Sequence, residues 1–465
     1  MVGGGYCREC FEKQREIDRL TEENVRLRGR LRYQERVSRE EGFFGSSTPS
    51  SKIPVKANTA PPPAPRQRLR GGAKNGHVGH GRQAATPLSA ARVEQIAVAQ
   101  GCCPDCRVGL EDRGVRERTV IDCPPVRPRT TIYRLQIKRC PCCQRTFQAQ
   151  APALLPHSLY GNQLLTHIAV QHYVYGVPLG RLEAQTGIGY GSLIDALHRL
   201  GRLFASVPED LLRQYRRAPA KHADETGWRT DGHNGYAWLF ATPDLSLFRF
   251  RSTRSAAVPR EVFGSRRLPG VLVVDRYNAY NKLPCRLQYC YAHLLREVKD
   301  LARQFEDNSE VHAFTTTFAP LLAQAMGLRR LSITDAEYYA QAGTLKQQII
   351  DIAHAQAQHP GIHRIQAIFR EHAQRLYHWA ADRRVPAENN LAERELRPLV
   401  IARKVSFGSQ SEAGARTRET LMTVLGTLRR RFPDFEARFK AALDQLARQR
   451  TANPCKLLFY NHSPP

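Results

Sequence analysis

Four apolar residues, Val271 to Val274, run without a polar break and end at Asp275. Three of the four are β-branched, and such a run is typical of a strand that is buried on both faces. The acid falls where the strand would leave the core, so its carboxylate would be held rigidly at the rim of a sheet. Asp275 could also simply cap the turn that follows.

Two other stretches contain acids that could join Asp275. The upstream stretch is residues 222–228, His-Ala-Asp-Glu-Thr-Gly-Trp, and its candidate is Asp224. The downstream stretch is residues 388–394, Glu-Asn-Asn-Leu-Ala-Glu-Arg, and its candidate is Glu393. Acids from three separate elements could converge on one metal site, and we interpret the rest of the chain as serving that site.

Such a site suits phosphodiester cleavage, because the attacking and the leaving oxygen both gain negative charge. Two Mg²⁺ or Mn²⁺ ions about 3.5–4 Å apart can stabilise both oxygens, and Mg²⁺ prefers carboxylate oxygens and water. We expect Asp224 or Asp275 to bridge the two ions. Alternatives remain, because Glu225 could be the ligand in place of Asp224, and Glu393 could complete a helix capping box with Asn390.

The charge of the chain indicates what it binds. Its 465 residues contain 70 Lys and Arg against 43 Asp and Glu, which gives a net charge of +27. Nucleic acid is the first candidate partner for so basic a chain, and an anionic membrane is the second. No apolar run approaches the roughly 18 residues of a spanning helix, and no signal segment opens the chain, so we expect a soluble, cytoplasmic protein.

Cysteine spacing predicts a structural zinc site. Residues 103–106 and 140–143 are two C-x-x-C knuckles, and Zn²⁺ takes four such thiolates in a tetrahedron. Adjacent Cys102 and Cys142 leave the ligand register open by one residue, and small buried core thiols are the alternative. Before the second knuckle, residues 133–138 alternate between apolar and polar, as in a half-buried strand. The predicted ligands are Cys103, Cys106, Cys140 and Cys143.

Residues 1–41 are charged and predicted to be helical, with apolar side chains at heptad positions. A coiled coil between two chains is one interpretation, and a solvated helix packing on its own chain is the other. Residues 42–94 are basic and rich in Ser, Pro, Gly and Ala, so we predict a flexible linker. We interpret Cys7 and Cys10 as free thiols. The heptad residues are Ile17, Leu20, Leu27 and Leu31, with Asn24 at an a position.

The rest of the chain alternates between helical and strand-like patterns. Strands are expected at 236–240 and 247–250 as well as at Val271–Asp275. A helical segment before them contains a Gly-bearing turn, and it fits a helix-turn-helix or an ordinary helical hairpin equally well. We predict a zinc-ribbon DNA-binding domain at 95–149, a helical region at 150–217, the first part of a core at 218–302, a helical insertion at 303–385, the Glu393 helix with C-terminal helices at 386–450, and a tail at 451–465.

The order of these parts resembles the insertion-sequence-sixty-six family of bacterial transposases, in the version with an aspartate-aspartate-glutamate catalytic core. The resemblance covers nearly the whole chain. Its most specific piece runs from Asn389 to Pro398, Asn-Asn-Leu-Ala-Glu-Arg-Glu-Leu-Arg-Pro. The other matching pieces are the linker, the two knuckles and residues 222–228, 273–277 and 291–296.

The resemblance implies an α/β multidomain chain with a ribonuclease-H-like core interrupted by a helical insertion. It also implies that Asp224, Asp275 and Glu393 are the catalytic residues. The implied partners are double-stranded DNA, as element ends and as target, further copies of the chain, and accessory proteins that elements of this family often encode. The implied location is the bacterial cytoplasm, in association with the nucleoid.

One departure concerns a basic residue. Many transposases of this catalytic type place Lys or Arg seven residues after the glutamate, where this chain has Val400. Arg397 and Lys404 would share the face of Glu393 if the helix continued, which makes them candidates for contacts to DNA ends. Pro398 is expected to kink or interrupt that helix, because it lacks an N–H and crowds the preceding turn.

The function predicted from these features is a transposase that nicks DNA by two-metal hydrolysis and joins the 3′-OH to target DNA. A DNA-binding or regulatory protein with an inactive core is one alternative, and a zinc-ribbon RNA-binding factor is another. A stand-alone nuclease would cleave without joining. A second metal site at Cys285, Cys290 and His293 has only three visible ligands, so an orienting or structural His293 is favoured.

Overall fold

The computed structural model describes residues 158–460 continuously, with 128–139, 141–143, 146–148, 154–156 and a few positions nearer the N-terminus. Positions described between Lys13 and Asn24 are helical, and Ile17 is 55% exposed and Leu20 50%. Pairing of this helix with another chain stays a prediction. The predictions for the 42–94 linker and for seven single residues lie outside the described residues: Cys7, Cys10, Leu27, Leu31, Cys103, Cys106 and Cys140.

A hairpin carries the second cysteine knuckle. Strands β1 (Ile137–Arg139) and β2 (Thr146–Gln148) pair antiparallel, and the exposed Cys142 and Cys143 are in the segment that joins them. The half-buried strand predicted over 133–138 is wrong in extent and in burial. Its strand begins only at Ile137, which is 62% exposed. Alternation predicts burial only where a second layer covers one face of the strand.

Helices occupy the region before the main sheet. The α3 helix ends at Gly187, whose φ of 68° provides the left-handed C-cap conformation that favours glycine. The α4 helix begins three residues later, so the predicted Gly-bearing turn is present, and its use in DNA binding stays a prediction. The helices are α2 (Asn162–Tyr173), α3 (Leu179–Thr186), α4 (Tyr190–Leu203) and α5 (Val207–Arg217).

A five-stranded mixed sheet follows, as the α/β expectation predicts. Its order is β5-β4-β3-β6-β7, in which β3, β4 and β5 run antiparallel and β6 and β7 run parallel to β3. Asp231 and Gly232 join β3 to β4 with positive φ at both residues, the conformation of the tight hairpin turn that Asp-Gly favours. The strands are β3 (Ala220–Thr230), β4 (His233–Thr242), β5 (Leu245–Arg251), β6 (Val271–Val274) and β7 (Arg286–Tyr289).

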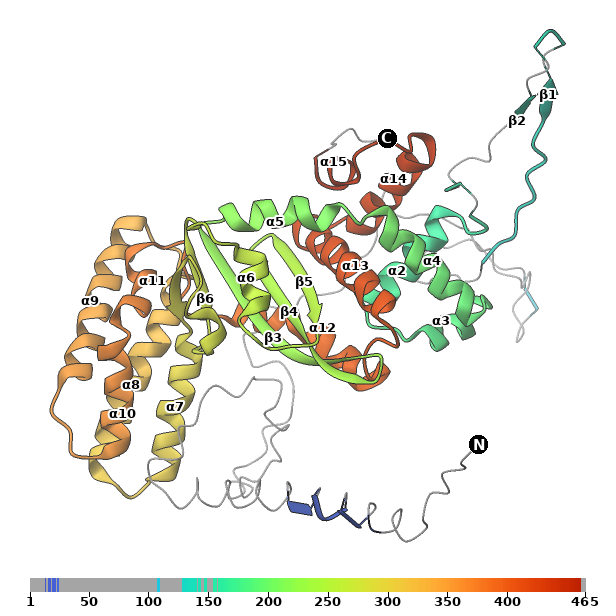
Figure 1. Ribbon diagram of the computed structural model, residues 1–465. Helices are drawn as coiled ribbons and strands as arrows, with labels where there is room; N and C mark the ends of the chain where they lie inside the picture. The colour runs from blue at the N-terminus through green and yellow to red at the C-terminus, as the bar shows by residue number, and fades with distance from the viewer. Residues whose placement is uncertain are drawn as a thin grey trace. The chain divides into compact units, whose positions relative to one another are not determined.

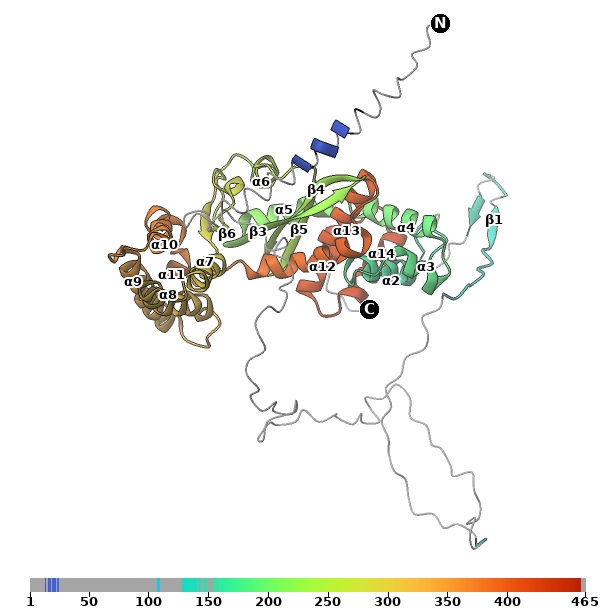
Figure 2. The same cartoon turned by 90° about the horizontal axis from the view of Figure 1, so that it is seen from below.

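Helices cover both faces of this sheet. The α5 helix and α6 (Ala257–Phe263) lie on one face, and α12 (Asn390–Ser406) crosses the other against β3 and β4 (Figure 1 and Figure 2). All four residues of β6 are buried, as its unbroken apolar run predicts. A short 3₁₀ segment, η3 (Asn278–Tyr280), follows β6.

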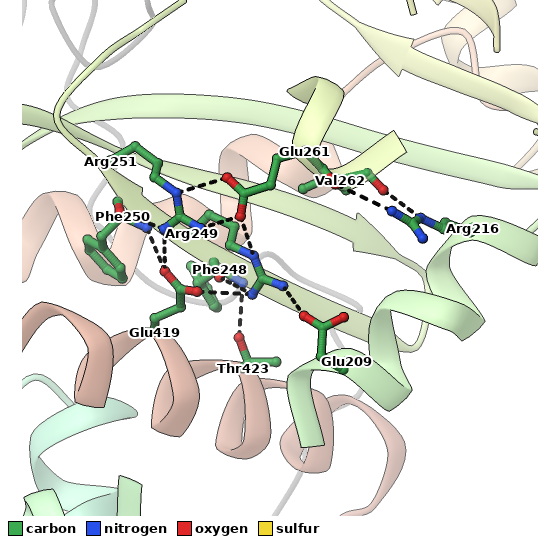
Figure 3. A network of polar contacts seen from close by, with 10 residues as sticks. All are labelled: Glu209, Arg216, Phe248, Arg249, Phe250, Arg251, Glu261, Val262, Glu419 and Thr423. Atoms are coloured by element: carbon green, nitrogen blue, oxygen red, sulfur yellow. Dashed lines mark hydrogen bonds and ion pairs between the residues drawn. The ribbon is translucent and has the colours of Figure 1, made fainter. Parts of the chain in front are cut away.

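The outer edge of β5 is covered by α13 (Glu412–Arg431), which removes an unpaired strand edge. Arg249 and Arg251 of β5 both form ion pairs with Glu419 of this helix, at 3.2 and 2.9 Å (Figure 3). Alternate N–H groups of β5 donate to side chains four residues apart on α13: Ser246 to Thr427 at 3.2 Å, Phe248 to Thr423 at 3.0 Å and Phe250 to Glu419 at 3.0 Å.

The predicted insertion between the second aspartate and the glutamate is helical, and the helices begin with α7 at Tyr291. These helices lie at the β6–β7 end of the sheet, opposite α13 (Figure 1). They are α7 (Tyr291–Gln304), α8 (Ser309–Leu328), α9 (Asp335–His354), α10 (Pro360–Glu371), η4 (Ala373–Arg375) and α11 (His378–Ala381). The C-terminal helices are α14 (Phe435–Arg448) and α15 (Pro454–Phe459).

Pro398 does not interrupt the glutamate helix, so that part of the expectation is wrong, and a kink at Pro398 stays a prediction. The α12 helix continues through Pro398 to Ser406. A proline inside a helix removes one hydrogen bond, here the one that the carbonyl of Arg394 would otherwise accept. Arg394 is exposed, so water can reach this turn and the packing of α12 on the sheet outweighs the loss.

Candidate active site

Asp224 and Asp275 come from neighbouring parallel strands. The ladder between β3 and β6 pairs His222 with Val273. The same register, continued by two residues, sets Asp224 beside Asp275 on one face of the sheet, with strands about 4.8 Å apart. Residues two apart on a strand share a face, so this is the face that His222 shares and that α12 covers.

The pKa values of both aspartates are raised, as expected for buried carboxyl groups with other acids nearby. Burial raises the pKa of Asp224 well above its usual range, and the charges of Glu225, Asp275 and Glu393 raise it further. Burial also raises the pKa of Asp275 to about 7, with Glu225 as the next cause. Several acids crowded into a buried site repel one another, and a divalent cation would relieve that repulsion.

Glu225 is occupied by other partners. Its side chain is 1% exposed, and Oε1 accepts from Arg254 Nη2 at 2.6 Å and Nε at 2.8 Å. The hydroxyl of Tyr280 donates to the other oxygen, Oε2, at 2.6 Å. Because both oxygens are engaged and the side chain leaves the opposite face of β3, the geometry favours Asp224 over Glu225 as the ligand.

Asp275 does cap the turn after β6, as the alternative interpretation expected. The backbone N–H of Tyr277 donates to its Oδ1 at 2.9 Å. This hydrogen bond uses one oxygen of the carboxylate and fixes the orientation of the whole group. The turn and the metal site are therefore compatible, and the turn positions the side chain.

Glu393 is brought to β3 by Asn389, the residue just before α12. The side-chain amide of Asn389 donates to the carbonyl of Ala223 at 2.8 Å, and its Oδ1 lies 2.9 Å from Nδ1 of His222. Its backbone N–H donates to Sγ of Cys290 at 3.1 Å. Since Ala223 precedes Asp224, these contacts tie the glutamate helix directly to the strand that carries the first aspartate.

The alternative in which Glu393 is only a helix cap is wrong. Asn389, not Asn390, is the N-cap residue of α12, and its side chain makes no capping hydrogen bond. Glu393 therefore lies one residue beyond the position that a capping box requires. Its Oε1 is buried without a hydrogen-bond partner among the described residues.

A further group of ligand-type atoms surrounds Glu393. Cys290, His293 and Glu393 each offer one atom, and the three atoms lie within 4.8 Å of one another. Burial, followed by the charges of Arg296 and Arg276, lowers the pKa of His293 to about 4. The sequence suggested Cys285, Cys290 and His293 as a second metal site. In the structure, Glu393 and not Cys285 lies beside Cys290 and His293.

The two predicted DNA contacts lie on α12. Arg397 is exposed and lines an open pocket of about 540 Å³ together with Arg394 and Arg429. Burial raises the pKa of Glu393, and the charges of Arg296 and Arg397 oppose this rise. Arg397 is therefore close enough to the candidate site to act on it. Lys404 is exposed further along the helix, and its contact with DNA stays a prediction.

Sequence reasoning missed three residues that build the site: Asn389, Arg254 and Tyr280. A signal existed for Asn389, because it opens the Asn-Asn-x-x-Glu-Arg run that already drew attention to Glu393. Arg254 and Tyr280 lie in segments without a recognisable pattern. Their contact with Glu225 depends on the way the chain folds between β5 and β7.

Comparison with known proteins gives the family. Residues 157–417 match the family model described as "Transposase IS66 family". The chain is 26% identical over 433 residues to the protein named "Uncharacterized protein y4qI" of Sinorhizobium fredii, covering 83% of this chain and 76% of that protein. It is 24% identical over 429 residues to "Uncharacterized protein y4jD" of the same organism, covering 81% and 80%.

The matched region includes the elements that carry all three acids, from β3 to α12. Within the described part of the chain, no helix combines the length and apolarity needed to cross a membrane. The family match extends over more than half of the sequence, and the resemblance first seen in the motifs is confirmed. The chain belongs to the transposase IS66 family.

Proposed function

We propose that the chain is an active transposase that cleaves and joins DNA at Asp224, Asp275 and Glu393. The observation that supports this proposal is that the charges of Glu225, of Asp275 after β6 and of Glu393 on α12 all raise the pKa of the buried Asp224 on β3. The order of the mixed sheet agrees with the ribonuclease-H-like core that the family implies.

The three carboxylates would hold Mg²⁺ or Mn²⁺, and their chemistry fits these hard cations. Two bound ions would supply charge stabilisation for the attacking and the leaving oxygens. The chain fixes the geometry: the turn at Tyr277 orients Asp275, and Asn389 holds the start of α12 against β3. Arg254 and Tyr280 engage Glu225, so that it does not compete with Asp224.

In this proposal, water attacks a phosphodiester at the end of the element and leaves a 3′-OH. That hydroxyl then attacks a target phosphodiester in the same site, and one bond forms as another breaks. The charges of Arg296 and Arg397 lower the pKa of Glu393. They would offset the charge of the DNA phosphates beside the acids.

DNA binding would use regions outside the acidic site. A net charge of +27 would give salt-dependent affinity for phosphates through counterion release. A zinc ribbon held by Cys103, Cys106, Cys140 and Cys143 would bind the element ends, with Arg397 and Lys404 contributing contacts. Joining two ends requires at least two copies of the chain, and accessory proteins of the element would be further partners.

A protein of the same family with an inactive core is the main competing function. The raised pKa of Asp224 beside other acids favours the active enzyme, because a regulatory DNA-binding protein gains nothing from burying repelling acids at a cost in stability. A stand-alone nuclease would use the same residues, and only the joining step distinguishes it.

The test is a cleavage-and-joining assay on labelled DNA that carries the flanking element ends, with Mg²⁺ or Mn²⁺. Wild type is compared with Asp275→Asn, Glu393→Gln and the control Asp307→Asn, an exposed acid between α7 and α8. We expect joined products from wild type and the control but not from the other two variants. Cleavage without joining would support a nuclease, and end binding without cleavage under either cation would support the inactive alternative.

A further inference from the structure

We propose that His293 supplies a nitrogen ligand to the cation held by Glu393, so that this position of the site prefers a transition metal such as Mn²⁺ over Mg²⁺. The inference rests on the proposed function and specifies the ligand set of the same site. It adds a side chain from α7 to the three acids that the family pattern contains.

The distance between the two side chains supports a shared ion. Nδ1 of His293 and Oε1 of Glu393 are 4.0 Å apart. This separation is too long for a hydrogen bond. Metal–nitrogen and metal–oxygen bonds of about 2.0–2.2 Å place two ligands of one ion roughly 3–4.4 Å apart, depending on the angle. The observed distance lies within that range.

The two facing atoms also lack other partners. Nδ1 of His293 and Oε1 of Glu393 are both buried, and neither has a hydrogen-bond partner in the part of the chain that the structure describes. A buried polar atom without a partner destabilises the folded state. A cation between the two atoms would satisfy both at once, whereas a direct contact at this distance satisfies neither.

The scaffold keeps the two side chains in this arrangement. His293 lies in the first turn of α7, and Cys290 is the N-cap residue of that helix. The N–H of Asn389 donates to Sγ of Cys290 at 3.1 Å, and the N–H of Tyr291 donates to the carbonyl of Ala387 at 2.8 Å. The start of α7 is thus joined to the segment that leads into α12, which limits how far the ligands can separate.

Cys290 has a different role in this account. Its sulfur already accepts the Asn389 hydrogen bond, and the side chain is buried. We therefore assign it to positioning rather than to the cation. An imidazole and carboxylates then remain, a donor set that binds Mn²⁺ and later first-row metals, whereas Mg²⁺ favours oxygen donors alone.

The experiment uses pulsed electron paramagnetic resonance on the full chain loaded with Mn²⁺. We expect a ¹⁴N coupling in wild type that changes when the protein is made with ¹⁵N-histidine. The coupling should disappear in His293→Asn and persist in His312→Asn, which alters an exposed histidine on α8. Mn²⁺ affinity, titrated in parallel, should fall at least about tenfold in His293→Asn, and Mg²⁺ affinity should fall less.

Glu393→Gln separates this inference from the proposed function. Mn²⁺ binding that depends on Glu393 but shows no histidine coupling would overturn the role of His293 and leave the acidic site intact. A coupling that persists in His293→Asn would also overturn it. Mn²⁺ binding that is unaffected by Glu393→Gln would overturn both the ligand set and the proposed cation site.

Discussion

Asn389 should be the most sensitive residue outside the acids, because one side chain joins the glutamate helix to the aspartate strand. It is 2% exposed. Replacing it with Ala removes the hydrogen bond to the carbonyl of Ala223 and the contact with Nδ1 of His222. Each partner atom then loses its hydrogen bond to Asn389, at about 1–3 kcal/mol each. The expected loss of stability is therefore about 2–6 kcal/mol.

The matched control is Asn390→Ala, which changes the exposed neighbour in the same Asn-Asn pair. Thermal unfolding should show a fall in Tm of roughly 4–24 °C for Asn389→Ala, since about 1 kcal/mol corresponds to about 2–4 °C in a domain of this order of size. The control should remain close to wild type. DNA cleavage measured well below the Tm should also fall in Asn389→Ala, because Glu393 is no longer held against β3.

Two results would refute this reasoning. If Asn389→Ala and Asn390→Ala had the same Tm, the buried contacts would not contribute the stability assigned to them. If Asn389→Ala lost stability but kept wild-type cleavage at low temperature, the residue would stabilise the fold without positioning the glutamate.

Other changes have distinct expected outcomes. Asp275→Asn should raise the Tm of the metal-free protein at pH 8, because the pKa of Asp275 is raised to about 7 from a usual value of 3.8. A carboxyl with a raised pKa destabilises the fold increasingly above its unfolded-state pKa, and fully above its folded-state pKa. The gain in Tm should therefore shrink towards pH 4, and a gain independent of pH would contradict this cause. Thr423→Val keeps the shape of the side chain but leaves the N–H of Phe248 without its acceptor at 3.0 Å. Urea unfolding should show that the free energy of unfolding falls by about 1–3 kcal/mol. An unchanged midpoint would mean that water replaces the hydroxyl. Purified protein should contain roughly one Zn²⁺ per chain by atomic absorption, and Cys143→Ser should lose it while Cys142→Ser retains it; the reverse pattern would move the ligand register by one residue.

The buried strand that precedes Asp275 could be predicted because its signal is local. The run Val271–Val274 predicts a buried strand, and the acid after it marks the rim of the sheet, as the structure confirms. The helical character of the insertion and of residues 435–448 likewise follows from short-range periodicity. The pairing of β3 with β6 could not be predicted, because the sequence of a strand does not indicate which other strand it pairs with.

The missed features depend on contacts between distant parts of the chain. Pro398 lowers the intrinsic preference for helix, but the packing of α12 against β3 overrides it. Glu225 and Asp224 look equivalent in the sequence, and only the approach of Arg254 and Tyr280 separates them. The alternating pattern around Ile137 predicts a strand with one covered face. Ile137 is exposed, and no second layer covers this hairpin among the described residues.

The most direct test of the account is an anomalous diffraction map of the protein crystallised with Mn²⁺. We expect a peak bounded by the carboxylates of Asp224, Asp275 and Glu393, with Glu225 still bound to Arg254. A peak that lies elsewhere, or a structure in which Glu393 turns away from the two aspartates while Mn²⁺ is bound, would contradict the central claim that these three acids form one cation site.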